Sequence, residues 1–211
     1  MPVGKSRIID IIGKTNFKKG IDEARGVLLS GGVVSFPTET FYGLAVNPMD
    51  EDAVDRLFRI KKRGPDRPIL ILLPSLESLD LYAAEIPDIA GDLIKRFWPG
   101  PLTILFRAMP CLSQRLTAGT GRIGMRLSSH PVATALAGSI NSPVTGTSAN
   151  ISGSPACRTA MEVYEYFKED ILILNGGETR GGIGSTILDV TVKPPEIVRE
   201  GAIGKEQLGL G

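Results

Sequence analysis

The sequence predicts a single-domain α/β protein built on one twisted, open, mixed sheet. Three observations support this prediction. A length of 211 residues suits one domain. Short apolar runs rich in β-branched residues alternate with segments of helical periodicity. No internal repeat or low-complexity linker divides the chain. Hydrophobic residues make up 42% and charged residues 22%, a composition typical of a globular protein that excludes disorder of the whole chain.

The predicted helices carry apolar residues three and four positions apart, which places these residues on one face. Glycine and proline set the limits of several helices. Gly31 and Gly32 end the first helix, and Pro131 opens another in its first turn. The helices are expected over residues 17–29, 50–60, 76–84, 86–97, 131–139 and 158–167.

The predicted strands are short apolar runs between these helices. Residues 68–73 read P-I-L-I-L-L, which is too short for a buried helix after a proline and is typical of a central strand. Pro37 stops the strand before it, and a loop is expected from there through residue 44. Some strands should be parallel and others antiparallel. They are expected over residues 33–36, 68–73, 102–106, 123–127, 144–147, 171–174, 185–190 and 196–199.

The expected organisation is an N-terminal extension over residues 1–15, one domain over residues 16–203 and a C-terminal tail with a weak helix over residues 204–211. Neither a signal-peptide pattern nor a run of about 20 apolar residues is present, so we expect a cytoplasmic protein with no membrane partner. Cys111 and Cys157 lack C-x-x-C spacing and neighbouring histidines, which predicts two free thiols rather than a disulfide or a zinc site. The net charge of +1 leaves nucleic-acid binding open, because a basic patch can be local.

Two polar segments could hold a small anionic substrate. The first follows the strand at 33–36 and reads P-T-E-T-F-Y-G over residues 37–43, with two hydroxyls, a carboxylate and a tyrosine. The alternative is a capped turn whose threonines bond local backbone. The second is K-K-R at 61–63, followed by Asp66 and Arg67. Lysine and arginine suit a polyphosphate, although cations are also favoured at any solvated helix end.

Two glycine-rich segments could bring backbone close to a ligand. Residues 146–153 read G-T-S-A-N-I-S-G, which is not a P-loop because G-K-[ST] is absent. Residues 176–185 contain five glycines and suit either a lid or a plain surface loop. His130 is the only histidine and precedes a proline at a helix start, so we expect a cap or packed residue and no catalytic triad.

The order of these segments resembles the YrdC/YciO-like family from about residue 31 to residue 203. The motifs that carry the resemblance are P-T-E-T-F-Y-G-L, K-K-R with D-R-P, W-P-G-P-L-T, M-R-L-S-S-H-P, S-A-N-I-S-G, G-S-T-I-L-D and R-E-G-A-I. The resemblance implies a twisted open sheet with a large basic cleft. It also implies synthesis of threonylcarbamoyl-AMP and pyrophosphate from L-threonine, bicarbonate and ATP. Partner proteins of such synthases transfer the threonylcarbamoyl group to an adenosine beside the anticodon of certain tRNAs.

The resemblance also implies residue roles. Lys61 and Arg63 would stabilise charge on the phosphates, with Mg²⁺ arriving on ATP and no metal site on the protein. ATP would be bound by Lys61, Arg63, Arg67, Arg122, Ser148, Asn150 and Arg199. Threonine would be bound by Thr40, Arg126, Gly146 and Ser185.

The chain departs from the synthase pattern mainly around the amino-acid half of the site. Leu72 stands where that branch often has a histidine, and Arg122 stands where it has a threonine. Gly182-Ile183-Gly184 replaces the usual Val-Glu sequence. An alternative is therefore a YciO-like protein that binds tRNA or double-stranded RNA and has a nucleotide cleft with another amino-acid substrate or none. A third possibility is a carbamoyl-adenylate former with a different acceptor.

Overall fold

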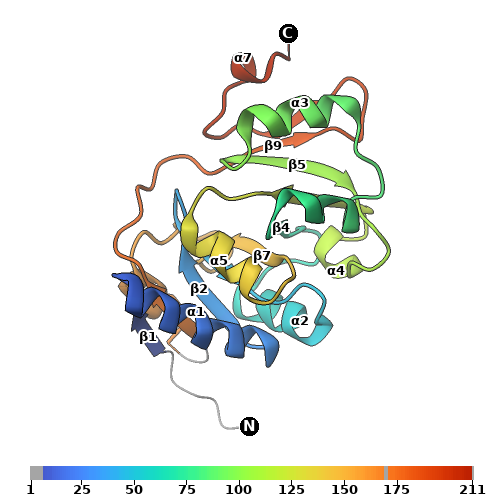
Figure 1. The fold of residues 1–211 in the computed structure, drawn as a ribbon. Helices are drawn as coiled ribbons and strands as arrows, with labels where there is room; N and C mark the ends of the chain where they lie inside the picture. The colour runs from blue at the N-terminus through green and yellow to red at the C-terminus, as the bar shows by residue number, and fades with distance from the viewer. Residues whose placement is uncertain (1–6, 169–170, 211) are drawn as a thin grey trace.

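A computed structural model of the chain describes residues 7–168 and 171–210, and within these ranges ten strands form one sheet (Figure 1). The strand order is β1-β8-β2-β3-β7-β4-β6-β5-β9-β10. The strands are β1 Arg7–Asp10, β2 Val33–Pro37, β3 Tyr42–Ala45, β4 Leu70–Leu72, β5 Leu102–Arg107, β6 Arg122–Arg126, β7 Val144–Ser148, β8 Ile171–Asn175, β9 Thr186–Asp189 and β10 Glu196–Arg199.

The helices alternate with these strands along the chain, and one follows the last strand. They are α1 Lys14–Leu29, α2 Glu51–Ile60, α3 Asp88–Phe97, α4 Gln114–Thr117, α5 Pro131–Ser139, α6 Ala160–Tyr166 and α7 Lys205–Leu208, with a 3₁₀ helix at Leu76–Leu81. The segment expected as a helix over residues 76–84 is thus a 3₁₀ helix. None of the helices in the described ranges has the length and apolar character to cross a membrane.

The sheet is mixed, as the sequence predicts. β8 runs parallel to both β1 and β2, and β4–β6 and β5–β9 are also parallel pairs. The pairs β2–β3, β3–β7, β4–β7, β5–β6 and β9–β10 are antiparallel. α1 joins β1 to β2, which both run parallel to β8, the strand that lies between them in the sheet.

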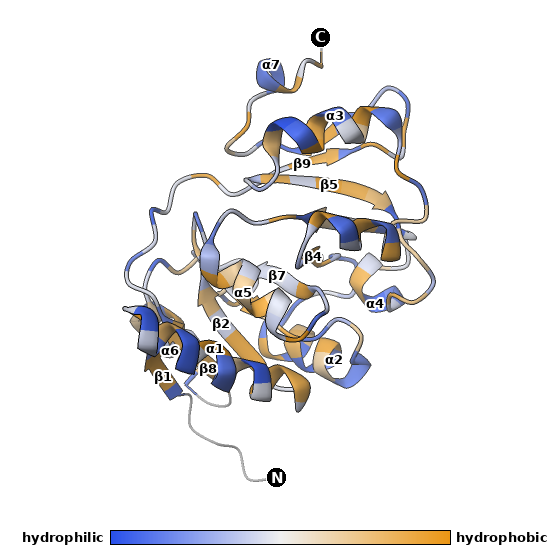
Figure 2. Ribbon diagram, in the orientation of Figure 1, coloured by the Kyte–Doolittle hydropathy of each residue, from blue (hydrophilic) through white to orange (hydrophobic). Residues whose placement is uncertain are grey.

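Each face of the sheet has its own hydrophobic cluster. α1 and α5 pack on one face, where Leu28 and Leu136 meet Val34 and Leu172. The other face holds the larger cluster, to which α2, α3 and α6 contribute. Figure 2 shows largely hydrophobic strands between helices that alternate hydrophobic and hydrophilic residues. α1 and α5 cover only part of their face, and the uncovered part carries the site described below.

Two strands correct the sequence predictions. β3 begins inside the segment expected as a loop, because Pro37 is followed by a tight turn rather than a long excursion. β1 lies inside the segment expected as an N-terminal extension and pairs with β8, so the domain begins before residue 16. Its partner is more than 150 residues away in sequence, which no local pattern reveals. The expected C-terminal tail contains the short helix α7, whose Leu208 is buried. Residues 1–6 and 211 of these segments lie outside the described residues.

Candidate active site

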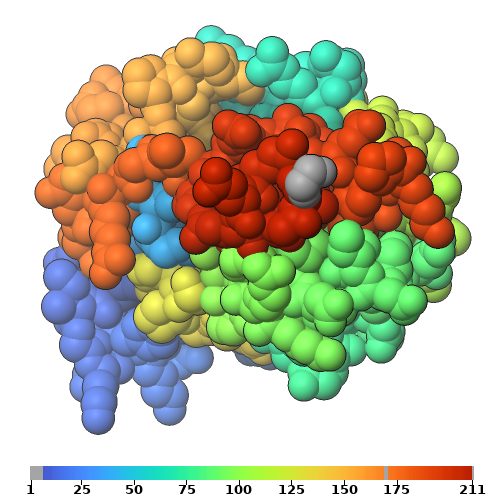
Figure 3. Space-filling view, turned by 90° about the horizontal axis from the view of Figure 1, so that it is seen from above, coloured from blue at the N-terminus to red at the C-terminus, as the bar shows by residue number. Residues whose placement is uncertain are grey.

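A cavity of about 440 Å³ opens on the sheet face beyond α5. Strand register places alternate residues of β4, β6, β5 and β9 on this face, including Leu72, Arg126, Thr103 and Ile187. The loops after β2 and before β9 form its rim, and β10 supplies Arg199. Figure 3 views the molecule from above, with light-blue residues visible between the red C-terminal segment and the orange segment beside it. The site therefore combines segments from both ends of the chain.

Two glycines keep the floor of the cavity open. A Cβ on Gly146 of β7 would lie 2.6 Å from Leu70 Cδ1, and one on Gly124 of β6 would lie 3.0 Å from Leu70 Cβ. Larger residues at either position would push the leucines or fill the space above the sheet. Leu70 and Leu72 themselves line the cavity, so the floor is apolar.

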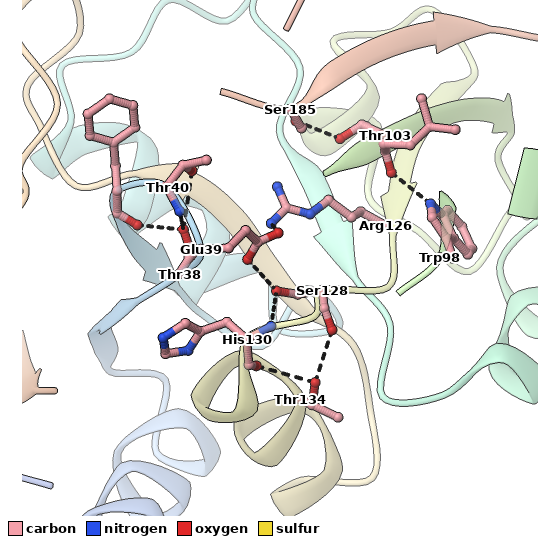
Figure 4. Close-up of polar contacts among 12 residues, drawn as sticks. Thr38, Glu39, Thr40, Trp98, Thr103, Arg126, Ser128, His130, Thr134 and Ser185 are labelled. Carbon is pink, nitrogen blue, oxygen red and sulfur yellow. Dashed lines mark hydrogen bonds and ion pairs between the residues drawn. The ribbon is translucent and has the colours of Figure 1, made fainter. Parts of the chain in front are cut away.

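A buried ion pair lies at one side of the cavity (Figure 4). Arg126, at the end of β6, donates from one terminal guanidinium nitrogen to Glu39 Oε1, and its buried Nε atom has no hydrogen-bond partner among the described residues. Ser128 Oγ donates to the second carboxylate oxygen of Glu39 at 2.8 Å. Burial lowers the pKa of Arg126, and the charge of Glu39 opposes this shift. Arg126 thus presents a desolvated positive charge, which attracts an anion more strongly than an exposed one.

A second guanidinium lies across the cavity. Arg199 of β10 donates to the carbonyl oxygen of Ser185 at 2.6 Å and contacts Ser185 Oγ at 3.2 Å. Ser185 Oγ also shares a hydrogen bond of 2.9 Å with Thr103 Oγ1 (Figure 4). Arg199 and Arg126 are close enough for the charge of Arg199 to lower the pKa of Arg126. Two cations with hydroxyls between them suit a ligand with more than one anionic group.

Gly201 packs against the backbone around Ser185, to which Arg199 donates, and we expect its replacement to destabilise the fold. A Cβ on Gly201 would lie 2.3 Å from the carbonyl oxygen of Gly184 and 2.4 Å from the amide nitrogen of Thr186. Because both atoms are backbone, Gly201→Ala must push apart the segments that carry Ser185 and Arg199. We expect the free energy of unfolding to fall by about 2–3 kcal/mol.

Chemical denaturation of Gly201→Ala and of a matched Gly26→Ala variant would check this prediction. Gly26 lies within α1, and a Cβ there meets nothing within 4 Å. The control should therefore be neutral or gain about 0.5–1 kcal/mol. Equal stability of the two variants would contradict the close packing described at Gly201.

Lys61 does not line the cavity, but it bonds the end of β7 and the loop that follows. Its side chain is buried, and Nζ donates to the carbonyl oxygens of Ser148 at 2.5 Å and Asn150 at 2.8 Å. Asn150 Oδ1 lies 3.4 Å from Nζ and accepts from Ser148 Oγ at 2.6 Å. Burial, followed by the charge of Arg63, lowers the pKa of Lys61 to about 7. Lys61 therefore shapes the loop that presents Ser148 to the cavity.

The predicted site residues fall into two groups. The cavity is lined by Thr40, Arg63, Arg126, Gly146, Ser148, Ser185 and Arg199. Four others are not among the lining residues: Lys61, Arg67, Arg122 and Asn150. Arg122 instead forms a 2.6 Å ion pair with the buried carboxylate of Asp189. Arg67 accepts a hydrogen bond from Arg63 through its carbonyl oxygen, which helps to hold Arg63 at the cavity rim. The role of each residue toward a ligand stays a prediction.

Sequence reasoning assigned no binding role to several residues at the cavity. Thr103, Ile183 and Glu200 line it, and Glu39 holds Arg126. Strand alternation could have placed Thr103 on the same face as Leu105, but nothing local indicates which face stays uncovered. His130 caps α5 as expected, since its Nδ1 accepts from the amide of Val132 at 3.3 Å. Both cysteines are free.

The described residues contain no group of three or more histidine, cysteine, aspartate or glutamate side chains that could hold a metal ion. The cavity instead offers guanidinium and hydroxyl donors. Such donors recognise carboxylates and phosphates through charge-assisted hydrogen bonds. Fold and site together define an α/β protein with a cavity at the surface of a mixed sheet, lined in part by guanidinium and hydroxyl groups.

Comparison with known proteins defines the family. The Sua5_yciO_yrdC family model, described as "Telomere recombination", matches residues 26–201. The chain belongs to the Sua5/YciO/YrdC family, which confirms the resemblance seen in its motifs. The threonylcarbamoyl-AMP synthase of Pyrococcus abyssi is 40% identical over 199 residues, covering 92% of this chain and 58% of that protein. This chain thus spans less than two thirds of the archaeal relative.

Two solved structures share the fold. P. abyssi Sua5 complexed with L-threonine is 38% identical, with a TM-score of 0.90 over 96% of this chain and 60% of that one. E. coli YciO is 27% identical, with a TM-score of 0.82 over 94% of this chain and 96% of that one. The predicted twisted open sheet is confirmed by these similarities.

Proposed function

We propose that this protein is an L-threonylcarbamoyladenylate synthase, which forms threonylcarbamoyl-AMP and pyrophosphate from L-threonine, bicarbonate and ATP. The observation that carries the proposal is the cavity between Arg126 and Arg199, two cations on a shared ligand-sized space. The named activity of the P. abyssi relative and the threonine complex of its structure support the same substrates.

The reaction needs positioning and charge neutralisation more than a protein nucleophile. The amine of threonine joins bicarbonate with loss of water, which gives a carbamate. A carbamate oxygen then attacks the α-phosphorus of ATP, the bond to the β-phosphate breaks, and pyrophosphate leaves. Arg126 would bind the threonine carboxylate, with Thr40 and Ser185 donating to it or to the threonine hydroxyl. Arg63, Arg199 and Ser148 would bind the nucleotide.

The metal requirement follows from the substrate. Mg²⁺ enters with ATP and neutralises phosphate charge, so no dedicated set of protein carboxylates is needed. Lys61 would support the nucleotide site through the loop of Ser148 and Asn150 rather than by direct contact. We further propose that the protein acts in the cytoplasm and hands its product to proteins that modify tRNA.

The proposal is tested by incubating the protein with Mg·ATP, bicarbonate and each of several amino acids. Pyrophosphate release would be measured together with mass detection of the adenylate. We expect both signals with threonine, a loss of both when bicarbonate is withheld, and weaker signals with serine and valine. Release with another amino acid alone would reassign the substrate.

The YciO-like alternative makes a different prediction in the same assay. Its supporting observation is the similarity to E. coli YciO over nearly the whole of both chains. A protein that binds Mg·ATP but forms no adenylate with any amino acid would favour it. Binding of tRNA or double-stranded RNA that weakens steeply with salt would then identify the ligand.

A further inference from the structure

A carboxylate that the sequence did not assign, Glu39, holds the guanidinium that lines the cavity. Within the described part of the chain, Glu39 is the one hydrogen-bond acceptor found for the Arg126 side chain. The side chains of both partners are largely buried, with 8% of Arg126 and 18% of Glu39 exposed. A buried guanidinium has few water contacts to hold it, so its orientation depends on this partner.

The position of Glu39 is itself fixed from two directions. The turn that carries it is closed by Thr38, whose amide and hydroxyl both donate to the carbonyl oxygen of Phe41. Thr38 Oγ1 also accepts from the amide of Thr40 at 3.2 Å. At the far end of the side chain, Ser128 Oγ donates to Glu39 Oε2 and accepts from the amide of His130 at 3.2 Å (Figure 4). Glu39 is thus a rigid link between the turn after β2 and the start of α5.

The contact leaves part of the guanidinium for a ligand. Only one terminal nitrogen of Arg126 donates to Glu39, although the side chain carries five N–H groups. Arg126 lines the cavity, while neither Glu39 nor Ser128 does. Glu39 therefore approaches the guanidinium from outside the ligand space, in a position to orient it without occupying that space.

We propose that Glu39 is a positioning residue that orients Arg126 toward the carboxylate of the amino-acid substrate. The inference rests on the proposed function for the identity of that substrate. Under this inference, Glu39 contributes to the recognition of the amino acid and has no role in nucleotide binding. Removal of Glu39 should weaken threonine binding and leave Mg·ATP binding unchanged.

Three variants give a graded test. Glu39→Gln keeps the shape of the side chain and one acceptor oxygen but loses the charge. Glu39→Ala loses the acceptor oxygens as well as the charge. Ser128→Ala removes only the hydrogen bond from Ser128 to the second carboxylate oxygen of Glu39. Threonine affinity by calorimetry should weaken about 3-fold in Ser128→Ala, about 10-fold in Glu39→Gln and more than about 50-fold in Glu39→Ala. Affinity for Mg·ATP should stay within about twofold in all three.

A control variant and a second measurement distinguish a positioning role of Glu39 from a general loss of structure. Glu23→Gln removes the carboxylate of an ion pair with Arg7 near the N-terminus, at residues that do not line the cavity, and should change neither affinity. The ¹⁵N resonances of the Arg126 guanidinium should show hindered rotation in the wild type and averaging in Glu39→Gln. This readout needs no substrate.

The outcomes distinguish the inference from the proposed function. A wild-type protein that binds Mg·ATP but no amino acid would overturn the proposed function and, with it, the carboxylate role of Glu39. A wild-type protein that binds threonine, with Glu39→Gln binding it equally well or more tightly, would overturn the inference alone. Equal weakening of threonine and Mg·ATP binding would also overturn it, because a structural role affects both ligands.

Discussion

Arg126→Ala should reduce threonine-dependent pyrophosphate release by at least about 100-fold. The variant loses a desolvated cation that would pair with the substrate carboxylate, and removal of one member of such a pair costs about 2–5 kcal/mol. It also leaves the carboxylate of Glu39 without its cationic partner. Initial rates at varied threonine and at varied ATP would locate the effect, which should fall mainly on the KM for threonine.

The matched control for this variant is Arg107→Gln. Arg107 lies at the end of β5, where its side chain is 65% exposed and contacts Glu85 at 3.9 Å. It carries the same charge as Arg126 but does not line the cavity. A similar loss in both variants would point to a general effect of charge, and an unchanged KM for threonine in Arg126→Ala would refute the assigned role.

Lys61→Met should lower the free energy of unfolding by about 3 kcal/mol near pH 8 and weaken Mg·ATP binding. Methionine fills much of the space but leaves the carbonyl oxygen of Asn150 without its donor. It also removes one of the donors to the Ser148 carbonyl oxygen and to Asn150 Oδ1. Each buried acceptor that loses its partner costs about 1–3 kcal/mol, although the loop can relax in part. Denaturant titrations and calorimetry would measure the two effects.

The same residue should give the wild type a distinctive pH dependence. The pKa of Lys61 is about 7 in the folded protein against 10.5 for an unperturbed lysine. Between these values the unfolded chain binds more protons, so the free energy of unfolding rises with pH. Relative to Lys61→Met, wild-type stability should increase by about 2 kcal/mol from pH 7 to pH 9.

The pH range of this comparison is chosen to avoid a second group. Burial raises the pKa of Cys157 to about 12, so above pH 9 the unfolded chain releases protons that the folded protein keeps. That effect lowers stability with rising pH and is shared by both proteins. Parallel curves for the wild type and Lys61→Met between pH 7 and 9 would mean that the folded protein leaves the pKa of Lys61 near its ordinary value.

The sequence predicts those parts of the molecule that depend on local patterns. Apolar runs located the strands around Leu102, Ile123 and Ile171, and Pro131 marked the first residue of α5. The order of the motifs predicted that Arg126 and Arg199 belong to one site, and both residues line the same cavity. These predictions succeed because the periodicity of burial and the polar residues of a loop depend on amino acids that are close together in the sequence.

What the sequence did not predict depends on partners distant in the chain. β1 was missed because its partner β8 lies at the other end of the domain. The basic run around Lys61 gave no sign that Lys61 turns inward while Arg63 reaches the cavity rim. Arg122 pairs with Asp189 of β9, 67 residues later, which no spacing rule anticipates.

The strand order also determines how much of the sheet must form during folding before the cavity is complete. The cavity needs β7, β4, β6, β5 and β9 side by side, and their sequence positions run from residue 70 to residue 189. Contacts between such distant segments form slowly, because long loops must close before any pairing is gained. No hairpin or single helix-strand unit of this chain contains the site. Ligand binding should therefore report on completion of the whole sheet, and a bound substrate should slow unfolding of the entire domain rather than of one edge.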